Sequence, residues 1–299
     1  MDSSSLSPAL RGQVIPHELD KDYKHLQVLL VPSEPQIVHV LLDRPQKRNA
    51  IHAGLWREIG SVFARLGRLG DDCRVVVLGG RGPSFCAGID ISSSSSALFP
   101  TGHDDVARTG VALLPQILDM QAAFSAIESC PVPIVAAIHG NCIGAGVDLA
   151  CCADVRLATT EAIFSVREVQ LGLAADVGTL QRLPKIVGNQ SSVRELCLTG
   201  RNFSAVEALR LGFVSEVTDD LARTVAKLCS TISQHSPIAV HGTKKALLYA
   251  RDHTVGDSLD QIATFNALAL QSSDLEASVK AKLARSRANF PPIPMHSRL

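Results

Sequence analysis

Three acidic residues lie among apolar and glycine-rich segments, where a solvated carboxylate would be out of keeping with its neighbours. They are Asp148, Glu168 and Asp176, and Asp148 directly follows the turn Gly144-Ala145-Gly146-Val147. Burial in apolar surroundings raises the pKa of a carboxyl group toward neutrality, which suits it to take up and release protons near pH 7. If the three side chains converge, we expect them to move a proton between two carbons of one substrate.

Two glycine-containing turns, Gly79–Asp90 and His139–Gly146, each follow an apolar strand-like run. We expect each turn to lead into a helix. The first backbone amides of a helix have no internal partner, and small residues let a ligand approach them closely. One amide from each turn could therefore hold a thioester oxygen. The alternative is that the glycines only make tight turns.

Other chemistries lack their motifs. The sequence has no G-x-G-x-x-G opening a βαβ unit, no G-x-x-x-x-G-K-[ST], no G-x-S-x-G and no H-E-x-x-H. Those patterns would indicate nucleotide phosphates, a serine hydrolase or a zinc centre. His139, at the end of a strand-like run, is more typical of a structural hydrogen-bonding residue than of a base. The sequence therefore predicts no nucleotide site and no metal.

Composition indicates an ordinary globular protein. The chain has 299 residues, of which 46% are hydrophobic, and this is ample for a large buried core. Lysine plus arginine and aspartate plus glutamate both total 29, so the charge does not suggest nucleic acid as a partner. The eight cysteines form no C-x-x-C pair. We expect them to be reduced and mostly buried.

The elements that must position the acids alternate between strand and helix. Nearly continuous apolar runs predict strands at Ile37–Leu42, Arg74–Leu78 and Val132–Ile138. Helical periodicity separates them at Gly54–Leu69 and Leu113–Ile127. Runs without polar alternation are typical of a sheet covered on both faces. The sequence thus predicts an α/β core.

The second half of the chain is predicted to become helical. Short strands are expected at Val155–Thr159 and Ile163–Val166, and helices at Ser191–Leu198, Ser204–Leu211, Leu221–Ser233 and Pro237–Tyr249. Pro291, Pro292 and Pro294 are expected to stop the last helix. The serine run Ser92–Ser96 is interpreted as a flexible loop.

Several motifs in order along the chain resemble those of the enoyl-CoA hydratase/isomerase, or crotonase, superfamily over about residues 25 to 290. The segments that carry the resemblance are Leu42-Asp43-Arg44-Pro45, Arg48-Asn49-Ala50, Phe85-Cys86-Ala87-Gly88-Ile89-Asp90, His139-Gly140 and Gly144-Ala145-Gly146. Within the family, Gly-Val-Asp-Leu at 146–149, Arg-Glu-Val at 167–169 and the long segment 172–184 are most similar to the branch that isomerises dienoyl-CoA.

The resemblance implies an α/β, crotonase-like spiral of ββα units with a C-terminal helical region that builds trimers, often paired as hexamers. On this basis we divide the chain into a flexible tail at 1–22, a spiral core at 23–217 and a helical oligomerisation region at 218–299. The implied substrate is an acyl-CoA. No metal or redox cofactor is implied, because coenzyme A is part of the substrate.

The resemblance also assigns roles. The backbone amides of Ile89 and Ala145 would form an oxyanion hole, and Ala87, Gly88, Ile89, Asp90 and Ile91 would line the substrate site. The implied reaction converts 3,5-dienoyl-CoA into 2,4-dienoyl-CoA in the β-oxidation of unsaturated fatty acids. Our hypothesis is that Glu168 serves C2, Asp176 serves C6 and Asp148 orients or tunes them.

Alternatives remain open. A hydratase of the family activates water between two glutamates twenty residues apart, and the shorter Asp148 at that spacing from Glu168 argues against hydration. Asp176 could instead form a structural ion pair with Arg167 or Arg182. Some superfamily members bind RNA or act as scaffolds; the balanced charge speaks against that function.

The chain ends suggest a location. The last three residues, Ser297-Arg298-Leu299, resemble the S-K-L address read by the peroxisomal import receptor. The first residues lack the apolar stretch of a secretory signal, and their acids argue against a transit peptide. We expect a peroxisomal protein, with the mitochondrion as alternative, and no membrane span.

Overall fold

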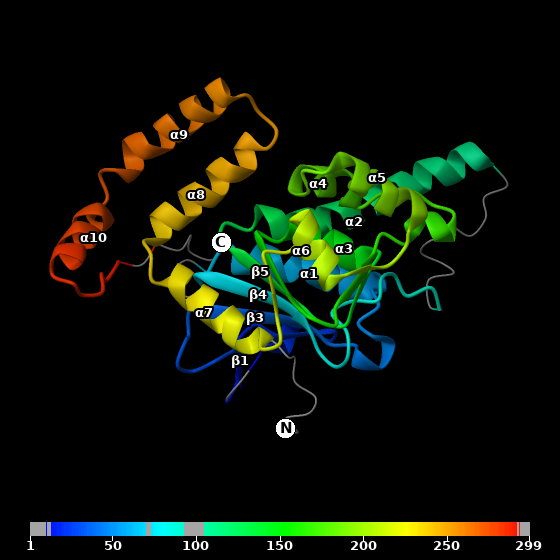
Figure 1. Ribbon diagram of the computed structural model, residues 1–299, viewed down its shortest axis with the longest axis horizontal. Coiled ribbons are helices and arrows are strands. Elements are labelled where there is room, and N and C mark those ends of the chain that lie inside the picture. Colours follow the sequence, from blue (N-terminus) through cyan, green and yellow to red (C-terminus); the bar gives the residue numbers. More distant parts are fainter. Residues whose placement is uncertain (1–9, 11–12, 70–72, 93–104, 292, 294–299) are drawn as a thin grey trace.

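The chain is described from a computed structural model, which covers residue 10 and residues 13–69, 73–92, 105–291 and 293. Its centre is a seven-stranded sheet in the order β1-β2-β3-β4-β5-β7-β10. The strands from β3 to β10 run parallel, whereas β1 and β2 pair antiparallel at one edge. A parallel sheet of this kind, interleaved with helices, confirms the predicted α/β core (Figure 1).

The strands of this sheet are short and mostly buried. Their bounds are Ile15–Pro16 (β1), Leu26–Leu30 (β2), Ile37–Leu42 (β3), Val75–Gly80 (β4), Ile134–Ile138 (β5), Val155–Thr159 (β7) and Glu216–Thr218 (β10). Every residue of β3, β4 and β5 is buried. The continuous apolar runs therefore arise because side chains on both faces of the sheet are covered.

Each face packs against a different set of helices. On one face Val75, Val77 and Val135 pack against α7, Leu221–Ser233, through Leu221 and Val225. The opposite face packs into the main core with α1 (Ala53–Leu66), α2 (Val106–Ser129) and α3 (Ala145–Cys152). Consecutive strand residues thus point to opposite layers, as the pleat requires.

A second, three-stranded sheet carries the chain from the core to the acids. It consists of β6 (Asn141–Ile143), β8 (Ile163–Ser165) and β9 (Phe203–Ser204). The elements that follow β8 are the 3₁₀ helix η5 at Glu168–Leu171 and the helices α4 (Thr179–Ile186), α5 (Gln190–Thr199) and α6 (Ala205–Leu211). Two further 3₁₀ turns, η2 at Asp20–Asp22 and η3 at Pro45–Lys47, lie near the N-terminal edge.

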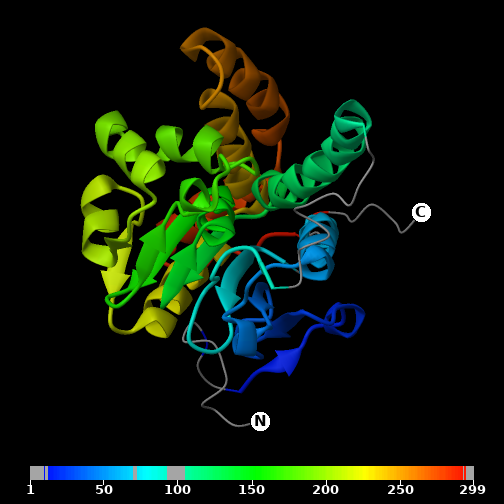
Figure 2. The ribbon, with the colours of Figure 1, turned by 90° about the vertical axis from the view of Figure 1, so that its right-hand side faces the viewer.

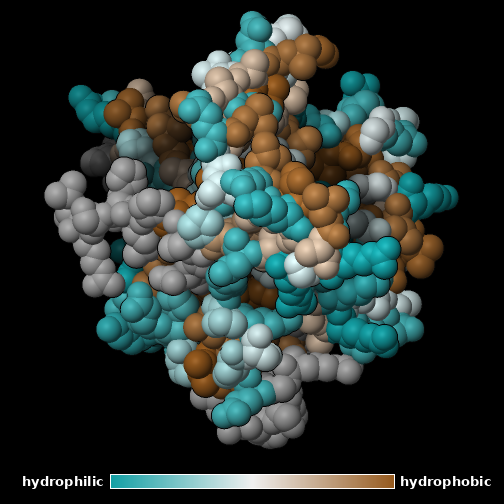
Figure 3. Space-filling model, turned by 90° about the vertical axis from the view of Figure 1, so that its left-hand side faces the viewer, coloured by the Kyte–Doolittle hydropathy of each residue, from teal (hydrophilic) through white to brown (hydrophobic). Residues whose placement is uncertain are grey.

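The C-terminal helices form an arm that stands away from the sheet layers (Figures 1 and 2). They are α8 (Pro237–Ala250), α9 (Val255–Ala269) and α10 (Ser273–Leu283). Large apolar side chains remain exposed along the arm, and Figure 3 shows hydrophobic residues gathered on that side; the most exposed members are Leu247, Val255, Leu259, Leu268, Leu270 and Leu283. Such a patch is typical of an interaction surface.

Two expectations about the chain ends are wrong. Within the expected tail at 1–22, β1 pairs with β2, and Leu19 is buried in the main core, because this segment closes the exposed edge of the sheet. The last described helix ends at Leu283, well before Pro291, so the prolines do not stop it. Arg285 instead turns the chain with a φ of 52°. The serine run that was interpreted as a flexible loop lies, from residue 93 on, outside the part of the chain that the structure describes.

One described helix, α2, is long and apolar enough to cross a membrane by length and composition alone. That evidence is weak, because helices of soluble proteins pass the same test. Its C-terminal half packs into the core through Phe124 and Ile127, whereas Val106 and Val111 near its start are exposed. The eight cysteines are free, and all but Cys197 are buried, which confirms the interpretation of their role.

Candidate active site

The two glycine-containing turns lie side by side. The amide of Cys86 donates to the carbonyl of Asn141, and the amide of Ile143 donates to the carbonyl of Cys86, each over 2.9 Å. Gly88 has a φ of 98°, and a Cβ added there would stand 3.1 Å from the Ile143 oxygen. Glycine is therefore required at this close approach. The sequence predicted the two turns, and the structure brings them together.

Only the second turn opens a helix directly. Gly144, with a φ of 52°, is the N-cap of α3, and Ala145 is its first residue. The first turn instead forms a parallel bridge between Ile89 and Ile51, so the expectation of a helix there is wrong. Tertiary pairing rather than a helix end exposes the Ile89 amide. Among the described residues, neither the Ile89 nor the Ala145 amide has a hydrogen-bond acceptor.

The rest of the first turn is fixed by its own contacts. The amide of Ala87 donates to the Arg48 carbonyl over 2.9 Å, and the carbonyl of Gly88 accepts from Ile51. Asp90 is buried and pairs with Arg44 over 2.9 Å. The Ser92 hydroxyl and Arg44 hold the pKa of the Asp90 carboxyl well below its usual range. Its carboxylate therefore braces the turn, while Ile91 beside it is exposed.

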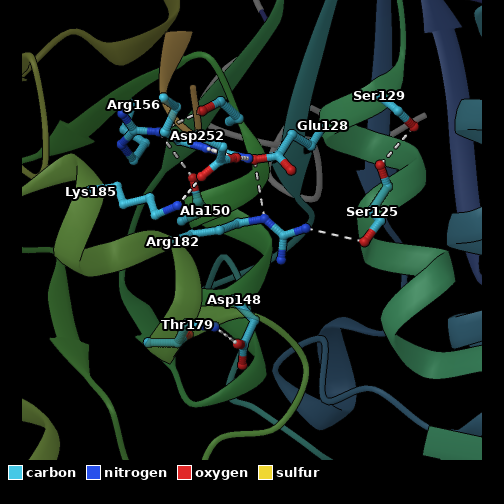
Figure 4. Close-up of polar contacts among 12 residues, drawn as sticks. Ser125, Glu128, Ser129, Asp148, Ala150, Arg156, Thr179, Arg182, Lys185 and Asp252 are labelled. Atoms are coloured by element: carbon cyan, nitrogen blue, oxygen red, sulfur yellow. Dashed lines mark hydrogen bonds and ion pairs between the residues drawn. The ribbon is translucent and has the colours of Figure 1, made fainter. Parts of the chain in front are cut away.

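Asp148 is fully buried on α3, one turn beyond the free amide of Ala145. Its Oδ1 accepts the backbone N–H of Thr179 over 2.6 Å (Figure 4), and its Oδ2 has no hydrogen-bond partner among the described residues. Loss of solvation by burial raises the pKa of Asp148 to about 6, against the opposing effect of Thr179. The group can therefore carry a proton near neutral pH.

Glu168 begins η5 and is buried close to the second turn. A Cβ added to Gly144 would lie 3.2 Å from its Oε1, so the carboxyl group rests against the residue before Ala145. Its Oε2 is buried without a partner. Burial first, and then the charge of Asp148, raises the pKa of Glu168 to about 7. Such a group exchanges protons readily at the pH of most cellular compartments.

Asp176 is half-buried in the segment between η5 and α4. Its charge contributes to the raised pKa of both Asp148 and Glu168, so the three acids share one electrostatic environment. Arg182 pairs with Glu128, and Arg167 bonds Ser165 and Asn202. Within the described chain, neither arginine pairs with the Asp176 carboxylate, which contradicts the alternative of a structural ion pair.

Sequence reasoning missed the groups that hold the acids. Oδ1 of Asp148 accepts a hydrogen bond from the backbone amide of Thr179, and a backbone donor of this kind has no signature in the sequence. The carbonyl of Asp176 accepts the side-chain amide of Gln121 over 2.6 Å, from the core half of α2. The available signal was the spacing of Gln121, Ser125 and Glu128, which places three polar side chains on one side of a helix.

A pocket of about 310 Å³ opens beside the first turn, between α1 and α2. Ile89, Trp56, Met120 and Ala123 contribute apolar walls, and His52 lies at its edge. The described residues contain no group of three or more His, Cys, Asp or Glu that could hold a metal ion. Nε2 of His139 donates to the Gly82 carbonyl over 2.9 Å.

A family model described as enoyl-CoA hydratase/isomerase matches residues 33–290. The chain belongs to this family. The solved structure of enoyl-CoA hydratase from Bacillus anthracis superimposes with a TM-score of 0.79 at 24% identity, covering 89% of this chain and 99% of that one. This similarity confirms the predicted crotonase-like fold.

Among curated relatives, the mitochondrial Δ(3,5)-Δ(2,4)-dienoyl-CoA isomerase of Rattus norvegicus is 45% identical, over 95% of this chain and 87% of the rat protein. The peroxisomal enzyme of the same name from Arabidopsis thaliana is 39% identical, over 90% of this chain and 98% of the plant protein. These similarities confirm the resemblance to this branch and assign the chain to the isomerases of the family.

Proposed function

We propose that this chain converts 3,5-dienoyl-CoA into 2,4-dienoyl-CoA. The observation that carries the proposal is the convergence of two buried carboxyl groups with raised pKa, Asp148 and Glu168, on the turn that presents the free amide of Ala145. The names of the rat and Arabidopsis relatives support the same reaction. The pocket beside Ile89 supports an acyl-CoA as the substrate.

The reaction needs a base at one end of the diene and an acid at the other. Glu168 removes a proton from C2, the double bonds shift to C2–C3 and C4–C5, and Asp176 delivers a proton to C6. Glu168 ends protonated and Asp176 ionised, so proton exchange with each other or with water restores the starting state. Asp148 accepts the amide of Thr179 and tunes the site, because its charge adds to burial in raising the pKa of Glu168.

The amides of Ile89 and Ala145 stabilise the charge that develops on the thioester oxygen. Loss of the C2 proton spreads negative charge onto that oxygen, and a fixed backbone donor contributes roughly 3 kcal/mol to its stabilisation. Neither amide donates to another group in the part of the chain that the structure describes, which supports this role. No metal or redox cofactor is needed, because the proton leaves and returns without a change of oxidation state.

Ultraviolet absorbance tests the proposal, because conjugation of the diene with the thioester creates a new chromophore. We expect the chromophore to appear when the protein is mixed with 3,5-dienoyl-CoA, and to be lost in Glu168→Gln and Asp176→Asn. A flat trace, with hydration of 2-enoyl-CoA instead, would replace the isomerase by the hydratase alternative. Stabilisation by an RNA oligonucleotide but not by a dienoyl-CoA would favour the RNA-binding alternative.

We also propose that the arm formed by α8, α9 and α10 assembles the chain into a trimer or a pair of trimers. The exposed leucines of α9 and α10 support this, because a monomer would leave them in water. Light scattering of the purified protein measures the assembly directly. A monomer at micromolar concentration would contradict it.

Import into peroxisomes is the location we propose, as part of the β-oxidation of unsaturated acyl chains. The end Ser297-Arg298-Leu299 and the peroxisomal Arabidopsis relative support it, whereas the rat relative is named mitochondrial. Imaging a fusion with a fluorescent protein at the N-terminus, with and without the last three residues, decides between the two compartments.

A further inference from the structure

One face of α2 is polar at the point where the helix passes the acids. Gln121, Ser125 and Glu128 recur at the spacing that places side chains on one side of a helix. Gln121 donates to the carbonyl of Asp176 over 2.6 Å. The Ser125 hydroxyl accepts from Nη2 of Arg182 over 3.1 Å, and Nε of Arg182 lies 3.2 Å from Oε1 of Glu128 (Figure 4).

These contacts enclose a single short segment, the turn 176–179. Gln121 holds the start of the turn, and Arg182 returns over its end: a Cβ added to Gly178 would stand 1.9 Å from Nη1 of Arg182. Gly178 has a φ of 137°, a conformation that favours glycine. The next amide, that of Thr179, donates to Asp148. The same turn therefore carries one acid and orients another.

Residues at and beyond the end of α8 hold Glu128 and α4 from the side away from this turn. Glu128 also pairs with Arg251 at the end of α8, and Asp252 pairs with Lys185 on α4. Arg182 and Glu128 are both largely buried, with side chains 11% and 15% exposed. Separating the partners of a shielded ion pair leaves a buried charge without its counter-charge, which is costly. The pair therefore holds the Arg182 side chain in place more firmly than an exposed pair would.

We propose that Gln121, Ser125 and Glu128 of α2, together with Arg182 of α4, form a clamp that positions Asp176 and Asp148 for proton transfer. The clamp residues are positioning residues, since they act on the acids through the turn 176–179, with Glu128 held in turn by Arg251. This inference rests on the proposed isomerase function for its kinetic readout, but not for its spectroscopic one. Misplacing a reacting group by about 1 Å can cost up to roughly 100-fold in rate.

The electrostatics of Asp148 give the clamp a second readout. Arg182 lowers the pKa of Asp148 against the stronger effect of burial. The other ionisable groups that act on Asp148 or are acted on by it are Glu168, Asp176 and the thiols of Cys86, Cys142, Cys151, Cys152 and Cys197. Burial raises the pKa of these thiols, so they stay neutral, and Arg182 is the cation among these groups.

The test compares Arg182→Met and Gln121→Leu with the control Arg201→Met, which removes an arginine that, like Arg182, is paired with acidic side chains, in this case Glu195 and Glu207 on the surface. The infrared carbonyl band of protonated Asp148, assigned with Asp148→Asn, is titrated in each folded variant. The kcat and KM for 3,5-dienoyl-CoA are measured beside it.

We expect Arg182→Met to move the Asp148 titration to higher pH, and both clamp variants to lower kcat by up to about 100-fold with a smaller change in KM. Arg182→Lys should return the pH at which Asp148 titrates most of the way to the wild-type value and should restore part of kcat. Arg201→Met should change neither. Folded clamp variants that titrate and turn over like the wild type, or lose only as much as Arg201→Met, would overturn the proposal.

Failure of the clamp and failure of the isomerase function give different results. If the wild type does not isomerise a dienoyl-CoA, the proposed function falls, but the titration still reports whether Arg182 and Gln121 hold the turn beside Asp148. If the wild type is active and the titrations of Arg182→Met and the wild type coincide, the clamp alone falls.

Discussion

Asp148 and Asp90 are both buried aspartates, and their surroundings drive their proton affinities in opposite directions. Asp90 is 5% exposed, pairs with Arg44 and accepts from Ser92, and its pKa is lowered. Asp148 is 0% exposed, accepts one backbone amide, keeps one oxygen without a partner, and its pKa rises to about 6. Burial alone therefore does not fix the direction of a pKa shift. Among the described residues, Asp90 has a cationic partner at contact distance and Asp148 has none.

The same contrast separates the two turns. The first turn uses its acid to fix the loop that presents the Ile89 amide, and the second presents the Ala145 amide beside acids that remain free to titrate. One turn is braced by an ion pair, and the other lies beside carboxyl groups whose pKa is raised. The predictions below test this division, beginning with the largest effect.

Replacing Glu168 by glutamine should lower kcat by about 10³-fold, because general acid–base groups typically contribute 10² to 10⁴. The group has a raised pKa and an unpartnered oxygen, so it is the best placed base. The absorbance assay with 3,5-dienoyl-CoA measures the change. A kcat within tenfold of wild type would remove Glu168 from the shuttle.

Asp148→Asn should raise the free energy of unfolding at pH 7.5 by up to about 3 kcal/mol, since its pKa is about 6 in the folded chain against an ordinary 3.8. A raised pKa contributes stability that is complete below about pH 4 and lost as pH rises to about 6. The variant should therefore lose this part of the pH dependence. Urea unfolding of the variant and the wild type at pH 4 and pH 7.5 measures this difference. A variant that is less stable than the wild type by the same amount at both pH values would contradict the account.

Asp90→Asn should have the opposite sign and lower the free energy of unfolding at pH 7.5 by about 2 kcal/mol, because Arg44 loses a buried partner. The lowered pKa of Asp90 means that its contribution exists above its ordinary pKa and disappears as the pH falls below about 4. Urea unfolding of Asp90→Asn and Asp148→Asn under the same conditions shows whether the two substitutions change the free energy of unfolding in opposite directions. A stabilising effect at pH 7.5 would break the comparison.

The rate should fall on the acid side of neutrality. Glu168 must be ionised to take the C2 proton, and its pKa is about 7 and coupled to that of Asp148 at about 6. We expect log(kcat/KM) to drop with a slope approaching one below about pH 6, which is tenfold per pH unit. A profile that stays flat down to pH 5 would show that neither group acts as the base.

The smallest effect is expected at an exposed ion pair. Arg201 is 40% exposed and bridges Glu195 and Glu207 on the surface. Arg201→Gln should lower the free energy of unfolding by less than about 1 kcal/mol and leave kcat unchanged, because exposed pairs contribute little. A loss of activity here would mean that surface charge, rather than local partners, governs the site.

Local sequence patterns were sufficient for buried strands and for an amphipathic helix whose apolar face packs on the sheet. The strands at Ile37–Leu42 and Val155–Thr159 and the helix at Leu221–Ser233 were predicted with the bounds that the structure has. By contrast, β1 and β2 were not predicted: β1 is a two-residue edge strand with exposed side chains, and both strands are defined by their antiparallel pairing rather than by a long apolar run.

The site was predictable in its residue types but not in its connections. The acids stood out because carboxylates are rare in apolar surroundings. The parallel bridge of Ile89 to Ile51 and the amide of Thr179 on Asp148 join segments distant in the sequence through backbone groups, and the side chain of Gln121 reaches the carbonyl of Asp176 across a similar separation. Such contacts leave no periodic pattern, so only the folded chain reveals them.

The most direct test of proton transfer between C2 and C6 is a single turnover of 3,5-dienoyl-CoA in heavy water, with the product analysed by mass spectrometry and NMR. The account predicts a 2,4-dienoyl-CoA that carries deuterium at C6, because the donor acid exchanges its proton with solvent before turnover. Addition of heavy water across a double bond, or a product without deuterium at C6, would contradict a shuttle with a separate acid for the distal carbon.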